Sequence, residues 1–376
     1  MDFQLKFSKD ITGCGDIFIG DHGISRFESP EVHTWHLGSA QVHQRSIEDV
    51  FPVFGEEIPH LVSQPLRSSY EHTRKNPIDW SSALGPQRFA RSLKASFSSS
   101  SLSIERIIKS RYAETLIKGR EILTRLQPAL VDLEAFREVT ASSNLGYAST
   151  FEPGPDGLTR PIRYSHSTST GRLTVASGPR ILSLPKGERR IIRSRWEQGQ
   201  VFMVDFVSLE PRVMLLLTRD EAPKDIYEAM RTELDLPDAT RARLKLATIS
   251  SLYGSKSQDP ALVAAVNRFF RSSEVGRRHL TGEEVCNLYG RRLSPEEASL
   301  RLSHFVQSTA VDVALLGFSS LLKLLPGGCI PLFLIHDALV IDVPPDCLSE
   351  FPQDMSIRIE PLGEFYLSSK RLQADI

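Results

Sequence analysis

The sequence is poor in cysteine and lacks long apolar runs. Its four cysteines, Cys14, Cys286, Cys329 and Cys347, are scattered over 376 residues, with no Cys-x-x-Cys pair and no histidine at ligand spacing. This distribution argues against a disulfide framework or a zinc finger and is typical of free thiols in a reducing compartment. No run of 18 apolar residues predicts a membrane span, and MDFQLKFSKD at the start has no signal-peptide core. We therefore expect a soluble intracellular protein with no membrane partner.

Net charge is also nearly absent. The chain has 45 Lys and Arg residues against 46 Asp and Glu residues, which gives a formal charge of -1. This balance neither predicts nor excludes a nucleic-acid partner, so only local clusters of charged residues can indicate one. Hydrophobic residues make up 40% and charged residues 24%, as in ordinary globular proteins, and the length allows two or three subdomains.

The amino-acid composition changes along the chain. Residues 1–95 mix short β-like runs (DIFIG, HTWHLG) with many Pro, His and Ser residues and predict no chemistry. The serine-rich stretch 96–103 is typical of a linker, and apolar residues at helical spacing follow it. In 105–125, six Lys and Arg residues against three Glu residues give a mildly basic helix, which either follows a phosphate backbone or is a solvated face.

Two apolar runs that are typical of buried strands each end near an aspartate. QVFMVDF at 200–206 contains Asp205, while IPLFLI and ALVIDV flank His336 and Asp337, which predicts two antiparallel strands joined at a tight turn. Neighbouring strand ends can bring two carboxylates within reach of a pair of divalent ions. Either aspartate alone is more simply explained as a turn residue. The prediction of a metal site therefore depends on the segment that lies between the two aspartates in the sequence.

A helix between the two aspartates supplies the complementary charge. RARLKLATISSLYG at 241–254 places Arg241, Lys245, Ile249 and Tyr253 four residues apart, on one slowly drifting helix face. Cations in the first half and an aromatic ring in the second half suit a nucleotide laid along the helix, with its phosphates first and its base last. A basic face alone is usually solvated. Combined with two carboxylates, it predicts a nucleotidyl-transfer site.

The order and spacing of these segments resemble motifs A, B and C of the DNA polymerase I family (family A). VDFVSLEPR at 204–212, the helix at 241–254 and LFLIHDALVIDV at 332–343 resemble the three motifs in turn. TGRL at 170–173 and VQSTAVD at 306–312 resemble two further family elements. The likeness covers about 145–376, with a weaker, thumb-like match before it.

The resemblance implies an α+β fold of the right-hand polymerase type, with an antiparallel palm sheet, helical fingers and a helical thumb. The implied divisions are a region of unknown role at 1–95, a thumb-like helical region at 96–145, palm at 146–220 with motif A, fingers at 221–300 with motif B, and palm at 301–376 with motif C.

The resemblance also implies roles for individual residues. Asp205 and Asp337, with the backbone carbonyl of Phe206, are expected to hold two Mg2+ ions, or Mn2+ in their place, and Lys245 to act in catalysis as a proton donor to pyrophosphate. The residues implied in nucleotide binding are Arg241, Lys245, Ile249, Tyr253, Glu210 and Tyr227, and those implied in DNA binding are Arg172, Gln307 and His336. Arg189 and Arg190 are expected to bind DNA because they belong to the basic run KGERRIIRSR at 186–195, which predicts a phosphate-binding patch facing the duplex.

Glu210 is expected to fill the space under the sugar and so to exclude a ribose 2'-hydroxyl. Three positions depart from the family pattern: Ile249 stands in place of Phe or Tyr, Tyr227 in place of His, and Ala338 in place of Glu. The last two, with LYGSK, lean toward the single-subunit RNA polymerases. Glu210 and the TGR element favour the DNA polymerases.

The expected protein is therefore a compact, phage-like, template-directed DNA polymerase that extends a primer with dNTPs in the cytosol of a bacterium or phage-infected host. Its expected partners are primer-template DNA, dNTPs and a replication accessory protein. The first 95 residues are too few for a proofreading exonuclease domain and show no such carboxylate set. Two alternatives stay open: an enzyme like the single-subunit RNA polymerases, and an inactive polymerase relative that only binds DNA.

Overall fold

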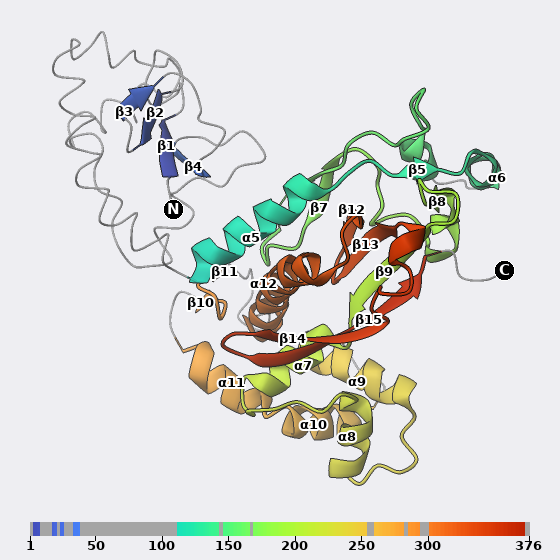
Figure 1. The fold of residues 1–376 in the computed structure, drawn as a ribbon. Helices are drawn as coiled ribbons and strands as arrows, with labels where there is room; N and C mark the ends of the chain where they lie inside the picture. The colour runs from blue at the N-terminus through green and yellow to red at the C-terminus, as the bar shows by residue number, and fades with distance from the viewer. Residues whose placement is uncertain are drawn as a thin grey trace. The chain divides into compact units, whose positions relative to one another are not determined.

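The computed structural model describes residues 111–142, 146–165, 168–253, 259–281, 285–293 and 301–372, together with four strand segments before them (Figure 1). The predictions for the linker at 96–103, for the start of the following helix and for Gly254 lie outside the described residues.

The chain divides into two units, Met1–Glu114 with Gly290–Arg292, and Thr115–Tyr289 with Leu293–Ile376. The first unit contains a four-stranded sheet. Its strands in spatial order are β3 (Gly23–Ser25), β2 (Ile17–Gly20), β1 (Phe3–Phe7) and β4 (His33–Leu37), of which β1 and β4 run parallel. The β-like runs DIFIG and HTWHLG are thus confirmed as strands.

The second unit is built on a five-stranded antiparallel sheet. Its strands in spatial order are β12 (Ile330–Ile335), β13 (Ala338–Val343), β9 (Gln200–Phe206), β15 (Gly363–Arg371) and β14 (Asp354–Ile359). All six side chains of β13 are buried, as expected of an interior strand of the sheet. Five of them are apolar, and the sixth, Asp342, accepts from the backbone N–H of Arg195 at 3.1 Å. With its helices, this unit is mixed α+β, as the sequence predicted.

Helices surround this sheet (Figure 1). They are α5 (Arg111–Arg125), α6 (Leu133–Ser142), α7 (Leu209–Leu216), α8 (Ile226–Glu233), α9 (Arg241–Tyr253), α10 (Pro260–Phe269), α11 (Ser272–His279) and α12 (Arg301–Leu324). Shorter elements are β5 (Leu130–Val131), β6 (Arg163–Ser165), β7 (Thr174–Ser177), β8 (Ile192–Arg193), β10 (Val285–Cys286), β11 (Arg292–Leu293) and the 3-10 helices at Ala148–Phe151, Lys186–Ile191 and Pro345–Cys347.

The two faces of the sheet differ in what covers them. Phe202, Val204 and Phe206 of β9 join the larger core cluster, which includes α7, α9 and α12. Val201 and Met203 belong to a second cluster, which includes Ile181 and side chains of β12 and β13. Because side chains alternate along a strand, Asp205 lies on the same face as Val201 and Met203.

Helix α12 is a core element. A Cβ added at Gly317 would lie 2.5 Å from Cζ of Phe206, so only glycine lets the helix approach β9 this closely. The rings of Phe206 and Phe318 are 5.3 Å apart. Among the described helices, α12 alone is long and apolar enough to cross a membrane, and 72% of its most apolar stretch is buried inside the protein.

Local capping explains where two helices begin. The helix predicted within 241–254 is confirmed as α9, which begins at Arg241. The backbone N–H of Arg243 donates to Oγ1 of Thr240 at 3.3 Å, so the threonine side chain caps the helix and sets its start. Asp225 caps α8 in the same way by accepting from two backbone amides.

Candidate functional site

Asp205 lies on β9, and Asp337 lies in the turn just before the neighbouring strand β13. Ala338 of β13 is directly opposite Asp205 of β9, so Asp337 is one residue from that pairing. The backbone N–H of Phe206 donates to the carbonyl of Asp337 at 3.2 Å. His336 and Asp337 form the two-residue turn between β12 and β13, and His336 has a φ of 55°, as such a hairpin requires. The predicted turn and antiparallel strands are confirmed.

The electrostatics of the pair favour a cation. Burial, together with the charge of Asp337, raises the pKa of Asp205 from 3.8 to about 7. Burial also raises the pKa of Asp337, and the charge of Glu210 adds to this rise. Two partly desolvated carboxylates side by side cost free energy when both are ionised, unless a positive charge compensates them.

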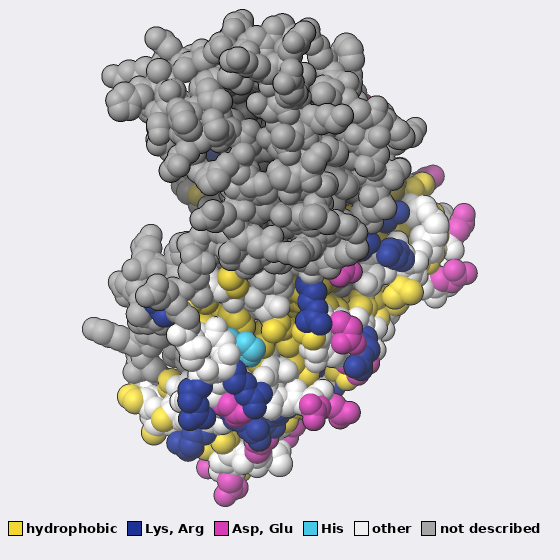
Figure 2. All heavy atoms as spheres, turned by 90° about the vertical axis from the view of Figure 1, so that its left-hand side faces the viewer, with side chains coloured by type: hydrophobic (Ala, Val, Ile, Leu, Met, Phe, Trp, Pro, Cys, Tyr) yellow, Lys and Arg dark blue, Asp and Glu magenta, His cyan; other side chains and the backbone are white. Residues whose placement is uncertain are grey.

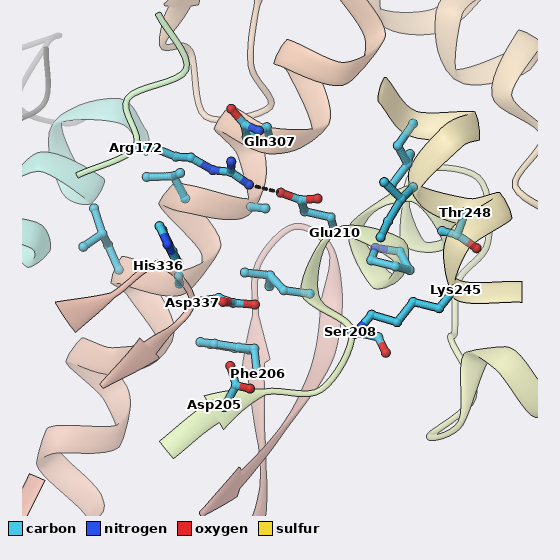
Figure 3. Close-up of a pocket in the computed structure, with 18 of the residues that line it drawn as sticks. Arg172, Asp205, Phe206, Ser208, Glu210, Lys245, Thr248, Gln307, His336 and Asp337 are labelled. Atoms are coloured by element: carbon cyan, nitrogen blue, oxygen red, sulfur yellow. Dashed lines mark hydrogen bonds and ion pairs between the residues drawn. The ribbon is translucent and has the colours of Figure 1, made fainter. Parts of the chain in front are cut away.

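A cavity of about 460 Å³ contains this pair. Side chains from β9, the turn after β12, α7, α9 and α12 line it, and Figure 3 shows several of them converging on the space above the strand ends. The predicted site residues that line it are Arg172, Asp205, Phe206, Glu210, Tyr227, Arg241, Lys245, Ile249, Gln307, His336 and Asp337. The fold thus gathers residues as far apart in the sequence as Arg172 and Asp337 around one space.

Helix α9 presents its cations to this cavity. Lys245 is exposed, and its side chain extends toward Ser208, in the turn that follows β9 (Figure 3). Arg241 is instead engaged: its Nη1 lies 2.6 Å from one carboxylate oxygen of Asp225, and its guanidinium stacks 4.9 Å from the centre of the Tyr227 ring. A phosphate that binds Arg241 would therefore have to replace the Asp225 contact.

Glu210 is held from two sides. Nη2 of Arg172 donates to its Oε1 at 2.7 Å (Figure 3), and the hydroxyl of Tyr253 donates to its other oxygen. Burial and the charge of Glu210 raise the pKa of Tyr253, so the phenol keeps the proton that it donates. Tyr253 does not line the cavity but fixes a side chain that does.

Gln307 extends this network from α12. With its amide oriented to suit its neighbours, its oxygen accepts from Nη1 of Arg172 at 2.9 Å and its nitrogen donates to Oγ1 of Thr170 at 2.7 Å. Arg172, predicted to bind DNA, therefore bridges Gln307 and Glu210 in this structure. The sequence did not predict this network.

The remaining predicted DNA-binding residues lie at different positions. His336 lines the cavity, and burial lowers its pKa, so it is neutral at pH 7. Arg189 donates to the carbonyl of Leu184 at 3.4 Å and to Sδ of Met203 at 3.7 Å, which places it against β9. Arg190 forms an ion pair with Glu138 at 2.8 Å. Neither arginine lines the cavity.

Two lysines near Asp205 were not among the named site residues. The charges of Lys370 on β15 and Lys186 in the 3-10 helix lower the pKa of Asp205 more than that of Lys245 does. Lys186 belongs to the basic run KGERRIIRSR, which is a sequence signal for phosphate binding. Lys370 belongs to no recognisable motif, and only the strand register brings it to the site.

A second group of cations lies on α10 and α11. Arg268, Arg271, Arg277 and Arg278 are exposed, but Glu274 forms ion pairs with both Arg271 and Arg278. Figure 2 shows that Lys and Arg side chains gather on one part of the described surface, with Asp and Glu side chains among them. Because positive and negative side chains are mixed on this surface, it is not the uniformly positive patch that binds phosphate.

No model of a known protein family matches the chain, and no curated protein sequence matches it. The arrangement of the cavity residues therefore carries the functional argument.

Proposed function

We propose that this protein is a template-directed DNA polymerase that extends a primer strand with dNTPs. The observation that carries the proposal is that Asp205, Asp337 and Glu210 line one cavity together with the α9 cations Arg241 and Lys245. A carboxylate pair suits divalent ions, and a cationic helix suits a triphosphate. Nucleotidyl transfer needs both in one space.

The donor set of the cavity fits Mg2+, a hard cation that prefers oxygen ligands. Asp205, Asp337 and the carbonyl of Phe206 would hold the ions. In the part of the chain that the structure describes, no cluster of three or more His, Cys, Asp or Glu side chains forms, so substrate phosphates and water would complete the coordination. When bound, two such ions stabilise the attacking and leaving oxygens of an in-line displacement.

The protein's own side chains have separate tasks in this proposal. Lys245 has no ion-pair partner among the described residues, so it is available to bind the triphosphate and to give a proton to the departing pyrophosphate. Arg241 binds the outer phosphates once it exchanges Asp225 for them. Glu210, held by Arg172 and Tyr253, occupies the space in which a 2'-hydroxyl would lie.

A right-hand architecture is part of the proposal. The five-stranded sheet would be the palm, α8 to α11 the fingers, and α5 with α6 the thumb. The supporting observations are that Asp205 lies on the middle strand of one antiparallel sheet, that Asp337 lies in the turn before the neighbouring strand β13, and that the cationic helix α9 lines the same cavity.

Primer extension tests the proposal directly. Labelled primer-template DNA is incubated with dNTPs or with rNTPs, each with and without Mg2+, and the products are resolved by length. We expect extension only with dNTPs and Mg2+. Extension with rNTPs would instead identify an RNA polymerase-like enzyme, and DNA binding without extension would identify an inactive relative.

Ile249 offers a sharper test of how the nucleotide lies on α9. Its side chain is 42% exposed and lines the cavity at the position where the family has an aromatic ring. We expect Ile249→Phe to lower the apparent KM for dNTP by about two- to tenfold, because an aromatic contact adds roughly 0.5–1.5 kcal/mol beyond its buried area. Steady-state extension kinetics at saturating DNA measure the effect.

Leu246 provides the matched control for this variant. It lies one turn earlier on α9 and is 66% exposed, but it does not line the cavity. Leu246→Phe should leave the KM for dNTP unchanged. A higher KM in Ile249→Phe, or an equal fall in both variants, would contradict the proposed position of the nucleotide.

A further inference from the structure

Three cations lie around the face of the sheet that carries Asp205. They are Lys186 and Arg189 of the 3-10 helix and Lys370 of β15. In the described part of the chain, no carboxylate lies within 4.0 Å of their charged nitrogens, and both lysines are exposed. Arg172 and Arg241 at the cavity instead have the carboxylate partners Glu210 and Asp225. Arg189 donates to the carbonyl of Leu184 and to Sδ of Met203, which are neutral groups. No carboxylate of the described residues therefore neutralises these three charges, and they can attract an external anion.

The strand register fixes the position of Lys370. β15 pairs antiparallel with β9, with Ser368 opposite Asp205 and Lys370 opposite Met203. Directly opposed residues of an antiparallel pair share a face, as do residues two apart along a strand. Lys370 and Asp205 therefore share one face, and Lys370 is set back by two residues, about 7 Å, toward the start of β9.

Arg189 and Lys186 belong to the same group. Nη1 of Arg189 lies 3.7 Å from Sδ of Met203, the residue opposite Lys370, so its guanidinium covers the same part of the face. Lys186 precedes it by three residues in one 3-10 helix. The three charges therefore come from two separate elements and converge on the Met203 end of the carboxylate site.

Lys245 approaches the carboxylates from the opposite end. Its side chain extends toward Ser208, beyond the last residue of β9 (Figure 3). The carboxylate pair thus lies between two cationic regions along the direction of the strand. Nucleotidyl transfer joins two phosphate-bearing reactants, a triphosphate and a strand end, at the site of reaction. With the triphosphate bound on α9, the other cationic region, formed by Lys186, Arg189 and Lys370, faces the nucleic-acid strand that is extended.

We infer that Lys370, Arg189 and Lys186 bind the backbone phosphates of the strand being extended, just behind its reacting 3' end, and so position that end at Asp205. This inference rests on the proposed polymerase function and adds to it the direction in which the strand leaves the site. Lys370 acts as a positioning residue, because its charge contacts a phosphate that takes no part in the reaction.

The test measures binding of labelled primer-template DNA to the full-length protein by fluorescence anisotropy, without nucleotide, over a range of salt concentrations. We expect Lys370→Ala to raise the Kd roughly three- to tenfold at low salt and to reduce the slope of log K against log salt by about 1, as loss of one phosphate contact does. Lys370→Arg should restore both. Lys323→Ala, which removes an exposed lysine from the end of α12, is the matched control and should change neither.

Primers with one neutral methylphosphonate linkage locate the contact. In the wild-type protein, one linkage next to the 3' end should weaken binding as much as Lys370→Ala does, and in Lys370→Ala that same linkage should have no further effect. If every linkage weakens both proteins equally, or if Lys370→Ala behaves like Lys323→Ala, the inference is wrong.

These binding data separate the inference from the proposed function. If the protein shows the expected linkage effect but extends no primer, the strand contact holds and the polymerase proposal fails. If it extends primers but shows no linkage effect, the strand contact fails and the polymerase proposal holds.

Discussion

Replacing either aspartate of the cavity by asparagine is expected to lower the rate of primer extension by at least about 100-fold. Asp205→Asn and Asp337→Asn keep the size and shape of the side chain but remove the charge that would hold a divalent ion. Binding of primer-template DNA should be nearly unaffected, because other side chains carry the proposed strand contacts. Extension rates under single-turnover conditions and anisotropy titrations measure the two quantities separately.

Loss of activity in these variants should not come from unfolding. Burial raises the pKa of both carboxyl groups, so in the absence of metal the ionised pair destabilises the folded state and an amide relieves that cost. The thermal midpoint of each variant should therefore be no lower than that of the parent. Asp354→Asn makes the same chemical change at an exposed position of β14 and should keep full activity. More than a few per cent of residual activity in either cavity variant would count decisively against the proposed metal site.

The second large effect concerns the choice of sugar. Glu210→Ala is expected to raise incorporation of rNTP relative to dNTP on the order of 100-fold, since truncation opens the space under the 2'-position. The ratio of kcat/KM for the two nucleotides measures it. Arg172 and Tyr253 fix Glu210 in place, so the side chain excludes volume as a rigid group.

Glu210→Gln separates volume from charge. The amide fills the same space but carries no charge, so it weakens the contact with Arg172. In the parent protein, Nη2 of Arg172 lies 2.7 Å from Oε1 of Glu210. If volume excludes the ribose, the Gln variant should keep most of the discrimination that the Ala variant loses. Equal losses in both variants would show that the charged network, and not the bulk of Glu210, sets the preference. An unchanged ratio in Glu210→Ala would assign the residue a structural role only.

Local sequence patterns predicted the elements that carry the carboxylates. The apolar runs around Asp205 and Asp337 and the polar break at His336 predict antiparallel strands and a two-residue turn, and each feature depends only on neighbouring residues. The four-residue steps of 241–253 similarly predicted one helix face, and that face lines the cavity at Arg241, Lys245 and Ile249. Periodicity is reliable where one face of an element is buried.

Contacts between distant segments could not be predicted in this way. The ion pair of Arg172 with Glu210 joins residues 38 positions apart, and the pairing of Arg241 with Asp225 depends on how α8 packs against α9. Lys370 reaches Asp205 only through the register of β15 against β9, for which a single sequence gives no signal. The predicted roles of Arg189 and Arg190 came from charge density alone, and the structure gives the two residues different neighbours.

The strand order of the large sheet has a consequence for where the molecule can open. β9 is the middle strand, with hydrogen-bonded neighbours on both sides, and β13 is bonded to both β12 and β9. Separating the backbones of Asp205 and Asp337 would break the centre of the sheet, which is expected only in global unfolding. Adjustment to a substrate must therefore come from side-chain rotamers and from the helices around the cavity. The backbone that carries Asp205 and Asp337 is expected to keep its geometry as long as the protein stays folded.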